Sequence, residues 1–398
     1  MSYILDVYRE TLKPDKNIGR LALYMAFFPS MMEGPICRYN DDAVSLWEGR
    51  RSSVQNLVFG AERILYGVMK KMVIADRLNI MIKTLYSGYA DYDGGMMVVA
   101  AIAYTCQLYM EVSGTMEVVI GSAELFGIVL PENFKRPFFS KSISEFWTRW
   151  HITLGTWFRD YIFYPISMSK PMKRLTSKAR KKIGNHFGPL IAGSIALFVV
   201  WLFNGWHYIC FGMYHFVLIA SANAVEPYTK KFLEKLHIRR EEGGYKCFRI
   251  VRTALLVCIG ELIFRAGSLR IAMRMLKKMF TDFNFRSFTD GTLLNLGMDK
   301  YDFLIVAVSV LIVLVISIAN ERGICIRQKL AEKKVDLVFS SKPPVEMGLT
   351  AIAVEQQDLV LIVPKNHPLA KNHSVDLTET LPYPQVYFSE GSGMRSVV

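Results

Sequence analysis

Acidic, guanidinium and imidazole side chains gather between residues 107 and 165, in a stretch that is otherwise apolar and aromatic. Glu111 and Glu117 lie in an apolar run of this stretch. A carboxylate inside a membrane is costly, so it usually faces a cavity or a charged partner. Both glutamates are therefore candidate substrate-binding residues. The alternative is that they pair with Arg149 or Arg159 and merely hold a helix bundle together.

A dense aromatic segment follows the two glutamates, with Trp150 next to His151 and then a Trp-Phe-Arg-Asp-Tyr run from Trp157. Trp and Tyr concentrate where one end of the side chain is wet. The pattern therefore predicts a pocket mouth shaped by Trp150, Arg159 and Asp160. His151 is a candidate catalytic base, because an imidazole titrates near neutral pH. The alternative is a hydrogen-bonded interfacial histidine that only shapes the pocket.

Apolar runs of membrane-spanning length surround these residues. The chain has 398 residues, 52% of them hydrophobic, and residues 303–319 read FLIVAVSVLIVLVISIA without a charge. A transmembrane helix needs roughly 17–25 such residues. Residues 188–203 and 208–222 are further candidates, and 96–110 and 254–264 are weaker ones, because charged or amide residues lie close by. The sequence predicts an α-helical multi-pass membrane protein.

Residues 54–78 differ from these runs, because their apolar residues recur at helical spacing but are interrupted by six charged ones. Such a pattern suits a helix at the membrane interface or one buried inside a protein bundle. We expect a helix here that does not face lipid along its length.

The net charge of +13 is unevenly placed, with basic clusters at residues 170–182 and 230–240. Short Lys/Arg-rich loops beside apolar spans stay on the cytoplasmic side of a membrane. Anionic lipid headgroups are therefore the expected partner of these clusters, and nucleic acid is not.

The six cysteines are scattered, without a Cys-x-x-Cys pair or zinc-ligand spacing. In an apolar run, a free cysteine behaves as a small hydrophobic residue. We expect no disulfide framework, no metal site and no tightly bound cofactor.

The character of the chain changes after about residue 331. Short β-branched runs at residues 335–339, 351–355 and 358–364 are separated by Pro, Gly and polar residues. Runs of this length and composition read as strands. The sequence thus predicts two parts, a membrane part over residues 1–331 and a short, incomplete α/β fragment over residues 332–398.

Seven segments, in order along the chain, carry a family resemblance. They are SYILDVYR at 2–9, FFPSMMEGPICRY at 27–39, GVMKKMVIADRL at 67–78, QLYMEVSGTMEVVIG at 107–121, PENFKRPFFSKSISEFWTRWHITLGTWFRDYIFYP at 131–165, GWHYICFGMYH at 205–215 and ELIFRAGSL at 261–269. With them, residues 2–331 resemble the membrane-bound O-acyltransferase (MBOAT) family. The likeness is to its bacterial branch, which contains the alginate O-acetylation protein and the D-alanyl transfer protein of teichoic acid synthesis.

The resemblance implies a helical bundle around a tunnel, in the bacterial cell membrane. An acyl group, most simply acetyl, would come from a thioester donor or a carrier protein on the cytoplasmic side. It would pass to a hydroxyl of a cell-surface polysaccharide, and D-alanyl transfer to teichoic acid is the alternative. In such enzymes a buried histidine of a Trp-His-Gly segment is taken to be the base, and a base fits because a hydroxyl is a poor nucleophile until it loses its proton.

Three departures from the family pattern accompany this likeness. The Trp-His-Gly segment is missing in its usual form: an ungapped match places Leu202 at the histidine position, and a gapped match leaves His207 as the substitute base. His215 matches a second histidine of the motif, which makes it a candidate substrate-binding residue, with a structural role as the alternative. The family commonly has Asp where this chain has Glu111 and Glu117. Its SYIIDVYR-like segment usually follows several membrane helices but begins here at Ser2, as expected of a fragment. A catalytically decayed or chimeric remnant is therefore a further hypothesis.

The tail resembles a different family. HPLA at 367–370, SVDL at 374–377 and SEGSGMR at 389–395 are similar to the effector-binding domain of LysR-type transcription regulators. The likeness covers part of one lobe, and Gly/Ser turns of this kind bind anions readily. A membrane-tethered ligand sensor is therefore a third hypothesis.

Overall fold

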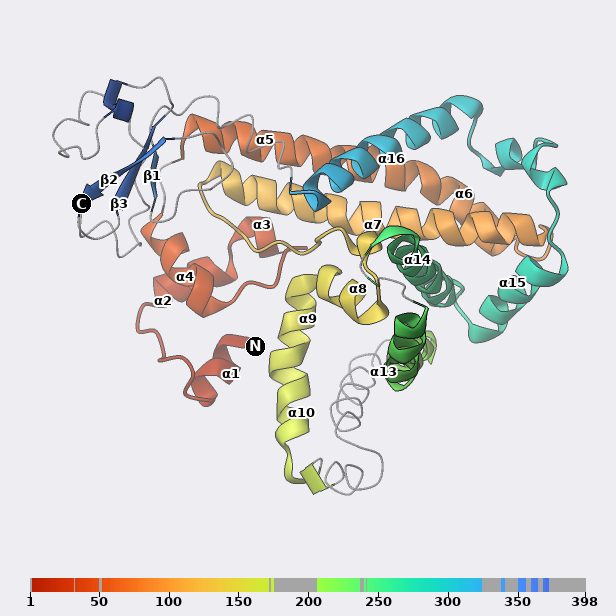
Figure 1. The fold of residues 1–398 in the computed structure, drawn as a ribbon, viewed down its shortest axis with the longest axis horizontal. Helices are drawn as coiled ribbons and strands as arrows, with labels where there is room; N and C mark the ends of the chain where they lie inside the picture. Colours follow the sequence, from red (N-terminus) through yellow and green to blue (C-terminus); the bar gives the residue numbers. More distant parts are fainter. Residues whose placement is uncertain are drawn as a thin grey trace. The chain divides into compact units, whose positions relative to one another are not determined.

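The computed structural model describes residues 2–31, 33–49, 52–171, 173–174, 206–236, 240, 242–323, 338–340, 350–355, 359–363 and 368–371, and only the backbone of residues 206–208, 338–340, 350–355, 359–363, 370 and 371. The helices are α1 (Ser2–Tyr8), α2 (Ile18–Met25), α3 (Phe28–Met31), α4 (Tyr39–Glu48), α5 (Val54–Val68), α6 (Asp76–Ser87), α7 (Gly94–Leu125), α8 (Ile143–Arg149), α9 (Ile152–Phe158), α10 (Tyr164–Met168), α13 (Trp206–Lys235), α14 (Gly243–Arg265), α15 (Leu269–Thr281) and α16 (Lys300–Glu321). Two π-helical segments are η1 (Met69–Ala75) and η3 (Arg159–Phe163), and short 3₁₀ turns cover Pro137–Phe139, Arg286–Phe288, Thr292–Leu296 and Pro368–Lys371. The strands are β1 (Val338–Ser340), β2 (Thr350–Glu355) and β3 (Leu359–Val363) (Figure 1).

Three of the described helices are long and apolar enough to cross a membrane: α7, α13 from Ile209 onward, and α16. These helices contain the predicted spans at 96–110, 208–222 and 303–319. The run at 254–264 lies within α14 but is not among the three. The predicted span at 188–203 lies outside the described residues. The predicted fold class, a helical membrane protein, is confirmed.

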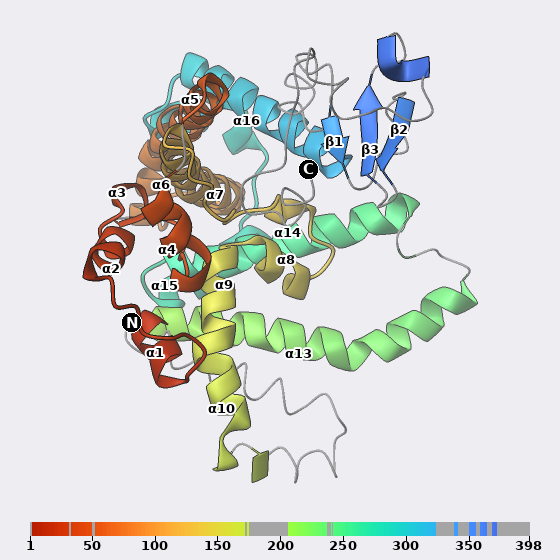
Figure 2. The ribbon, with the colours of Figure 1, turned by 90° about the vertical axis from the view of Figure 1, so that its left-hand side faces the viewer.

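The contacts within the chain divide it into two units, Met1–Val313 and Leu314–Val398. In the first unit, α5, η1 and α6 follow one another without a break, and α5 lies beside α7 in both views (Figures 1 and 2). The predicted helix at 54–78 is therefore real and continues to Ser87. Ser53 caps it by accepting a hydrogen bond from the backbone N–H of Asn56.

Two pairs of glycines bring α5 and α7 close together. A Cβ atom built on Gly67 would lie 2.5 Å from the carbonyl oxygen of Gly114, and one built on Gly60 would lie 2.7 Å from that of Gly121. Both distances are shorter than real Cβ contacts, so a larger residue at either position would force the helices apart. The glycines of each helix are seven residues apart, which returns them to nearly the same face after two turns.

The main apolar core of this unit is built from α6, α7, α14 and α15. Fully buried members include Met81, Met96, Leu262 and Met275. After α7 the chain turns through residues 126–142 and enters α8, which Ser142 caps by accepting from the backbone N–H of Glu145. α8, α9, η3 and α10 then follow in direct succession. Trp150 thereby lies beside Tyr109 of α7, with ring centroids 6.0 Å apart, whereas Arg159 and Asp160 lie beside Arg9 and Arg38.

In the second unit the three strands form an antiparallel sheet in the order β1-β3-β2. Ile352 on β2 pairs with Leu361 on β3, and Phe339 on β1 pairs with the same residue from the other side. The strands predicted in the tail are thus confirmed.

Candidate active site

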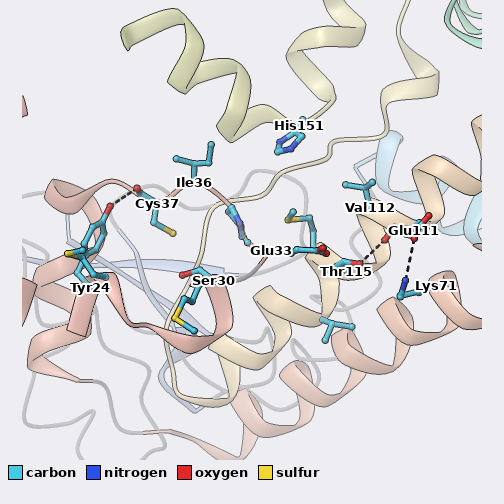
Figure 3. A pocket seen from close by; sticks show the side chains of 16 residues that line it. Tyr24, Ser30, Glu33, Ile36, Cys37, Lys71, Glu111, Val112, Thr115 and His151 are labelled. Atoms are coloured by element: carbon cyan, nitrogen blue, oxygen red, sulfur yellow. Dashed lines mark hydrogen bonds and ion pairs between the residues drawn. The ribbon is translucent and has the colours of Figure 1, made fainter. Parts of the chain in front are cut away.

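A pocket of about 890 Å³ opens in the first unit, between the middle of α7 and the segment that joins α3 to α4 (Figure 3). His151 and the pair Lys71 and Glu111 lie on different parts of its wall. The full lining is Tyr24, Met25, Ser30, Met31, Glu33, Gly34, Pro35, Ile36, Cys37, Lys71, Glu111, Val112, Thr115, Met116, Val118 and His151. A largely apolar wall with a few polar groups is typical of a small-molecule site.

Glu111 is one of those polar groups. Its Oε1 lies 3.5 Å from the Lys71 ammonium, and its Oε2 accepts a hydrogen bond from the Gln107 amide. Both side chains of the ion pair are about 40% exposed, at 42% for Lys71 and 40% for Glu111. A pair this exposed is weak, so either member can exchange its partner for a ligand.

His151 stands at the junction of α8 and α9, where its backbone has a φ of 48°. Left-handed backbone is uncommon for residues other than glycine, although His is enriched there. Burial lowers the pKa of the His151 imidazole from its ordinary 6.5, and a hydrogen bond involving its own backbone opposes this only in part. The imidazole is therefore neutral near pH 7 and able to accept a proton.

Asn133, in the loop after α7, holds this junction in place. The backbone N–H of Ile152 donates to its carbonyl oxygen at 2.9 Å. Its side-chain Oδ1 lies 3.2 Å from His151 Nδ1 and accepts from the Thr153 N–H at 3.1 Å and the Thr153 hydroxyl at 3.0 Å. Asn133 itself is only 1% exposed.

Arg159 and Asp160 lie in a second pocket, of about 570 Å³, which is lined in part by Arg9 and Arg38. Both residues belong to the π-helical segment η3, a kind of distortion that is frequent at functional sites. Burial would raise the pKa of Asp160, but hydrogen bonds from Arg38 and Arg159 outweigh it and lower the pKa below the usual range. Asp160 is thus an ionised carboxylate that already has two cationic partners.

Glu117 lines neither pocket. Its carboxylate lies 2.6 Å from Arg63 and 3.2 Å from Lys70, and Arg63 also bonds Glu132 at 2.6 Å. The charges form a network across α5, η1 and α7. Glu117 therefore forms ion pairs between helices, as the alternative expected, but with other partners than Arg149 or Arg159.

The partners proposed for the glutamates are different in the structure. Arg149 pairs with Glu145 one helical turn earlier, at 2.8 Å, and Arg159 pairs with Asp160 at 3.1 Å. The actual partners of Glu111 and Glu117 come from η1 and α5, elements that sequence spacing alone does not connect to α7.

Trp150 and His215 lie in aromatic surroundings. Trp150 stacks on Phe146, with ring centroids 5.3 Å apart, and also contacts Phe134. His215, in α13, is 2% exposed and contacts Trp147 and Phe211. Neither residue lines the two pockets above, and their predicted substrate-binding role stays a prediction.

His207, the candidate base, lies in the first turn of α13, where only the backbone is described. Among the residues that the structure describes, no group of three or more His, Cys, Asp or Glu side chains could hold a metal ion.

Lys71, Asn133 and Cys37 were not predicted as site residues. A signal existed for all three, since each lies in a segment that carries the family resemblance. Burial raises the pKa of the Cys37 thiol to about 12, helped by the nearby Asp42 carboxylate, so this thiol stays protonated and is a poor nucleophile.

Comparison with known families accounts for both parts of the sequence. Residues 14–180 match the model of MBOAT, the membrane-bound O-acyltransferase family, and residues 318–398 match that of the LysR substrate binding domain. The first segment thus carries a membrane-bound O-acyltransferase family domain, as predicted, and the tail carries the predicted LysR likeness.

Curated relatives agree with this assignment. A probable alginate O-acetylase of Pseudomonas syringae is 34% identical over 71% of this chain and 50% of its own length, and one of Azotobacter vinelandii is 31% identical over 81% and 58%. The teichoic acid D-alanyltransferase of Bacillus subtilis is 30% identical over 66% of this chain and 65% of its own length. The chain thus spans 50% and 58% of the lengths of these two acetylases.

Proposed function

We propose that this chain, as part of a bacterial cell-membrane enzyme, moves an acyl group from a thioester to a hydroxyl of a cell-surface polysaccharide. Acetyl is the simplest acyl group for this role. The main support is that the neutral imidazole of His151 and the Glu111 carboxylate line one pocket, and that all of its lining residues lie inside the family-matched segment. The proposal covers residues 1–331 as the membrane part and residues 332–398 as an appended fragment.

The reaction needs a base and an acyl donor. The base takes the proton of the acceptor hydroxyl as its oxygen attacks the thioester carbonyl carbon, and the proton then passes to the sulfur that leaves. His151 has the protonation state for this role, and His207 stays the second candidate.

The partners follow from this chemistry. The donor, as a free thioester or on a carrier protein, would reach the protein from the cytoplasmic side, and the acceptor from the opposite side. Membrane lipid would contact the exposed sides of α13 and α16 and surround the bundle that contains α7. Arg159, Asp160, Trp150 and His215 belong to the proposal as residues that shape the substrate path.

D-alanyl transfer to teichoic acid is the second candidate. A D-alanyl group carries an ammonium, and two carboxylates, Glu33 and Glu111, line the pocket where it would sit. Favourable pairing of a cation with a carboxylate is the observation that supports this alternative. A decayed remnant without activity is the competing hypothesis, motivated by the missing Trp-His-Gly segment.

An acyl-transfer assay on the full chain in liposomes tests these candidates. Purified protein is mixed with an acetyl thioester or a D-alanyl thioester and a soluble polysaccharide, and ester formation is followed by mass spectrometry. We expect ester from the acetyl donor above protein-free liposomes. Preference for the D-alanyl donor would favour the second candidate, and no ester from either would favour the remnant.

Substitution of the two histidines assigns the base. We expect His151→Gln to lower the transfer rate by about 10²–10⁴-fold, the usual contribution of a general base. His207→Ala is the matched comparison, and a loss of this size there instead would move the role to His207. Because burial lowers the pKa of His151 from its ordinary 6.5, the transfer rate should reach half its maximum at a pH below 6.5, as the imidazole gains its proton.

A further inference from the structure

The loop after α7 is tied to the α8–α9 junction at two backbone positions. The N–H of Ile152 donates to the carbonyl of Asn133, and the N–H of Lys135 donates to the carbonyl of Arg149, both at 2.9 Å. Asn133 is buried between these bonds. The Asn133 side chain can therefore form hydrogen bonds only with the groups packed around it.

The orientation of the Asn133 amide follows from its neighbours. The backbone N–H of Thr153 can only donate, and it lies 3.1 Å from one side-chain atom of Asn133. That atom must be the oxygen. The amide nitrogen then faces the sulfur of Met116 at 3.3 Å, which is a weak acceptor. The oxygen and nitrogen positions are thus fixed by a donor that cannot titrate.

The same oxygen lies 3.2 Å from His151 Nδ1. An amide oxygen only accepts, so Nδ1 must carry the hydrogen of the neutral ring, and Nε2 keeps its lone pair. We propose that Asn133 is a positioning residue that holds His151 in the Nδ1–H tautomer, with Nε2 as the free acceptor in the pocket. This inference rests on the proposed function for its catalytic meaning, but the tautomer itself does not depend on activity.

Thr153 extends the arrangement to Ile36, another residue of the pocket lining. Its hydroxyl donates to Asn133 Oδ1 and accepts from the backbone N–H of Ile36 at 3.0 Å. Ile36 and His151 both line the pocket. One buried amide oxygen therefore fixes the imidazole and, through Thr153, a second part of the wall. The titratable side chains that share this wall with His151 are Tyr24, Glu33, Cys37, Lys71 and Glu111.

Nitrogen-15 magic-angle-spinning NMR of the full chain in lipid bilayers reads the tautomer directly. The protein is labelled on its histidine rings, and the His151 signals are those that disappear in His151→Gln. At a pH above the titration we expect a protonated Nδ1 and an unprotonated Nε2. A protonated Nε2 in the wild-type chain would overturn the proposal.

Two variants test whether Asn133 is the cause. Asn133→Asp keeps an acceptor for all three donors and adds a negative charge, so His151 should titrate at higher pH. Asn133→Ala removes the acceptor, and the Nε2–H tautomer should appear. Asn56→Asp adds the same charge at the start of α5 and is the control, with no expected change. An unchanged titration in Asn133→Asp would also overturn the proposal.

Transfer activity separates this inference from the proposed function. If the tautomer is as stated and no acyl transfer is detected, the positioning role stands and the proposed function fails. If transfer occurs but His151 carries its hydrogen on Nε2, the positioning role fails alone.

Discussion

Glu111 and Glu117 belong to the same apolar helix, yet the structure places them in different settings. Six residues on an α-helix correspond to a rotation of about 240°, so the two carboxylates leave α7 on different faces. Glu111 reaches a pocket and shares a half-exposed pair with Lys71, whereas Glu117 lies among Arg63 and Lys70, with Lys70 only 4% exposed. A carboxylate in an apolar helix therefore indicates a polar neighbour. Whether the carboxylate binds a ligand or stabilises the bundle depends on how buried that neighbour is.

Removal of Glu117 should have the largest effect on stability. Glu117→Ala leaves Lys70 and Arg63 buried without their shared partner, and loss of one member of a buried pair costs about 3–5 kcal/mol. Unfolding by SDS in mixed micelles would measure this as a shift to lower SDS fraction. A loss under about 1 kcal/mol would mean that the network contributes little and that the two faces do not differ.

The glycine contacts beside Glu117 should have the next largest effect. Gly67→Ala places a Cβ 2.5 Å from the Gly114 carbonyl oxygen, and overpacking of this kind costs about 1–3 kcal/mol. Gly155→Ala in α9 is the matched control, because the nearest atom to its Cβ would be 3.8 Å away. At position 155 the stability should equal or exceed that of the wild-type chain, because Ala has a better helix propensity than Gly. Equal losses at both positions would show that close α5–α7 packing is not the reason.

Much of the architecture was predictable from sequence, because a helix or strand can be identified from the pattern of its own residues. The uncharged run at 303–319 exceeds what a soluble helix needs, and the β-branched runs of the tail are short and bounded by turn residues. The glycine pairs could not be predicted as contacts. Their seven-residue spacing is visible in each segment, but nothing in one segment tells that the other packs against it.

The site was predicted less completely than the fold, for the same physical reason. Glu111 and His151 were both identified by residue type, and the structure brings them to one pocket. Asn133 was not, because an asparagine in a loop is ordinary until its three hydrogen bonds are seen. Residue type reveals which groups can titrate, whereas the partners that set their protonation come from distant parts of the chain.

Removal of Glu111 should have the smallest effect on stability and completes the comparison. Because both members of its pair with Lys71 are about 40% exposed, Glu111→Ala should cost less than about 1 kcal/mol in the same SDS titration. If the pocket binds the transferred group, the transfer rate should nevertheless fall by about tenfold, which corresponds to roughly 1.4 kcal/mol at the barrier. A stability loss as large as that of Glu117→Ala would mean that Glu111, like Glu117, stabilises the helix bundle through its ion pair. An unchanged rate with unchanged stability would remove it from the site, and the pocket would then depend on His151 for its chemistry.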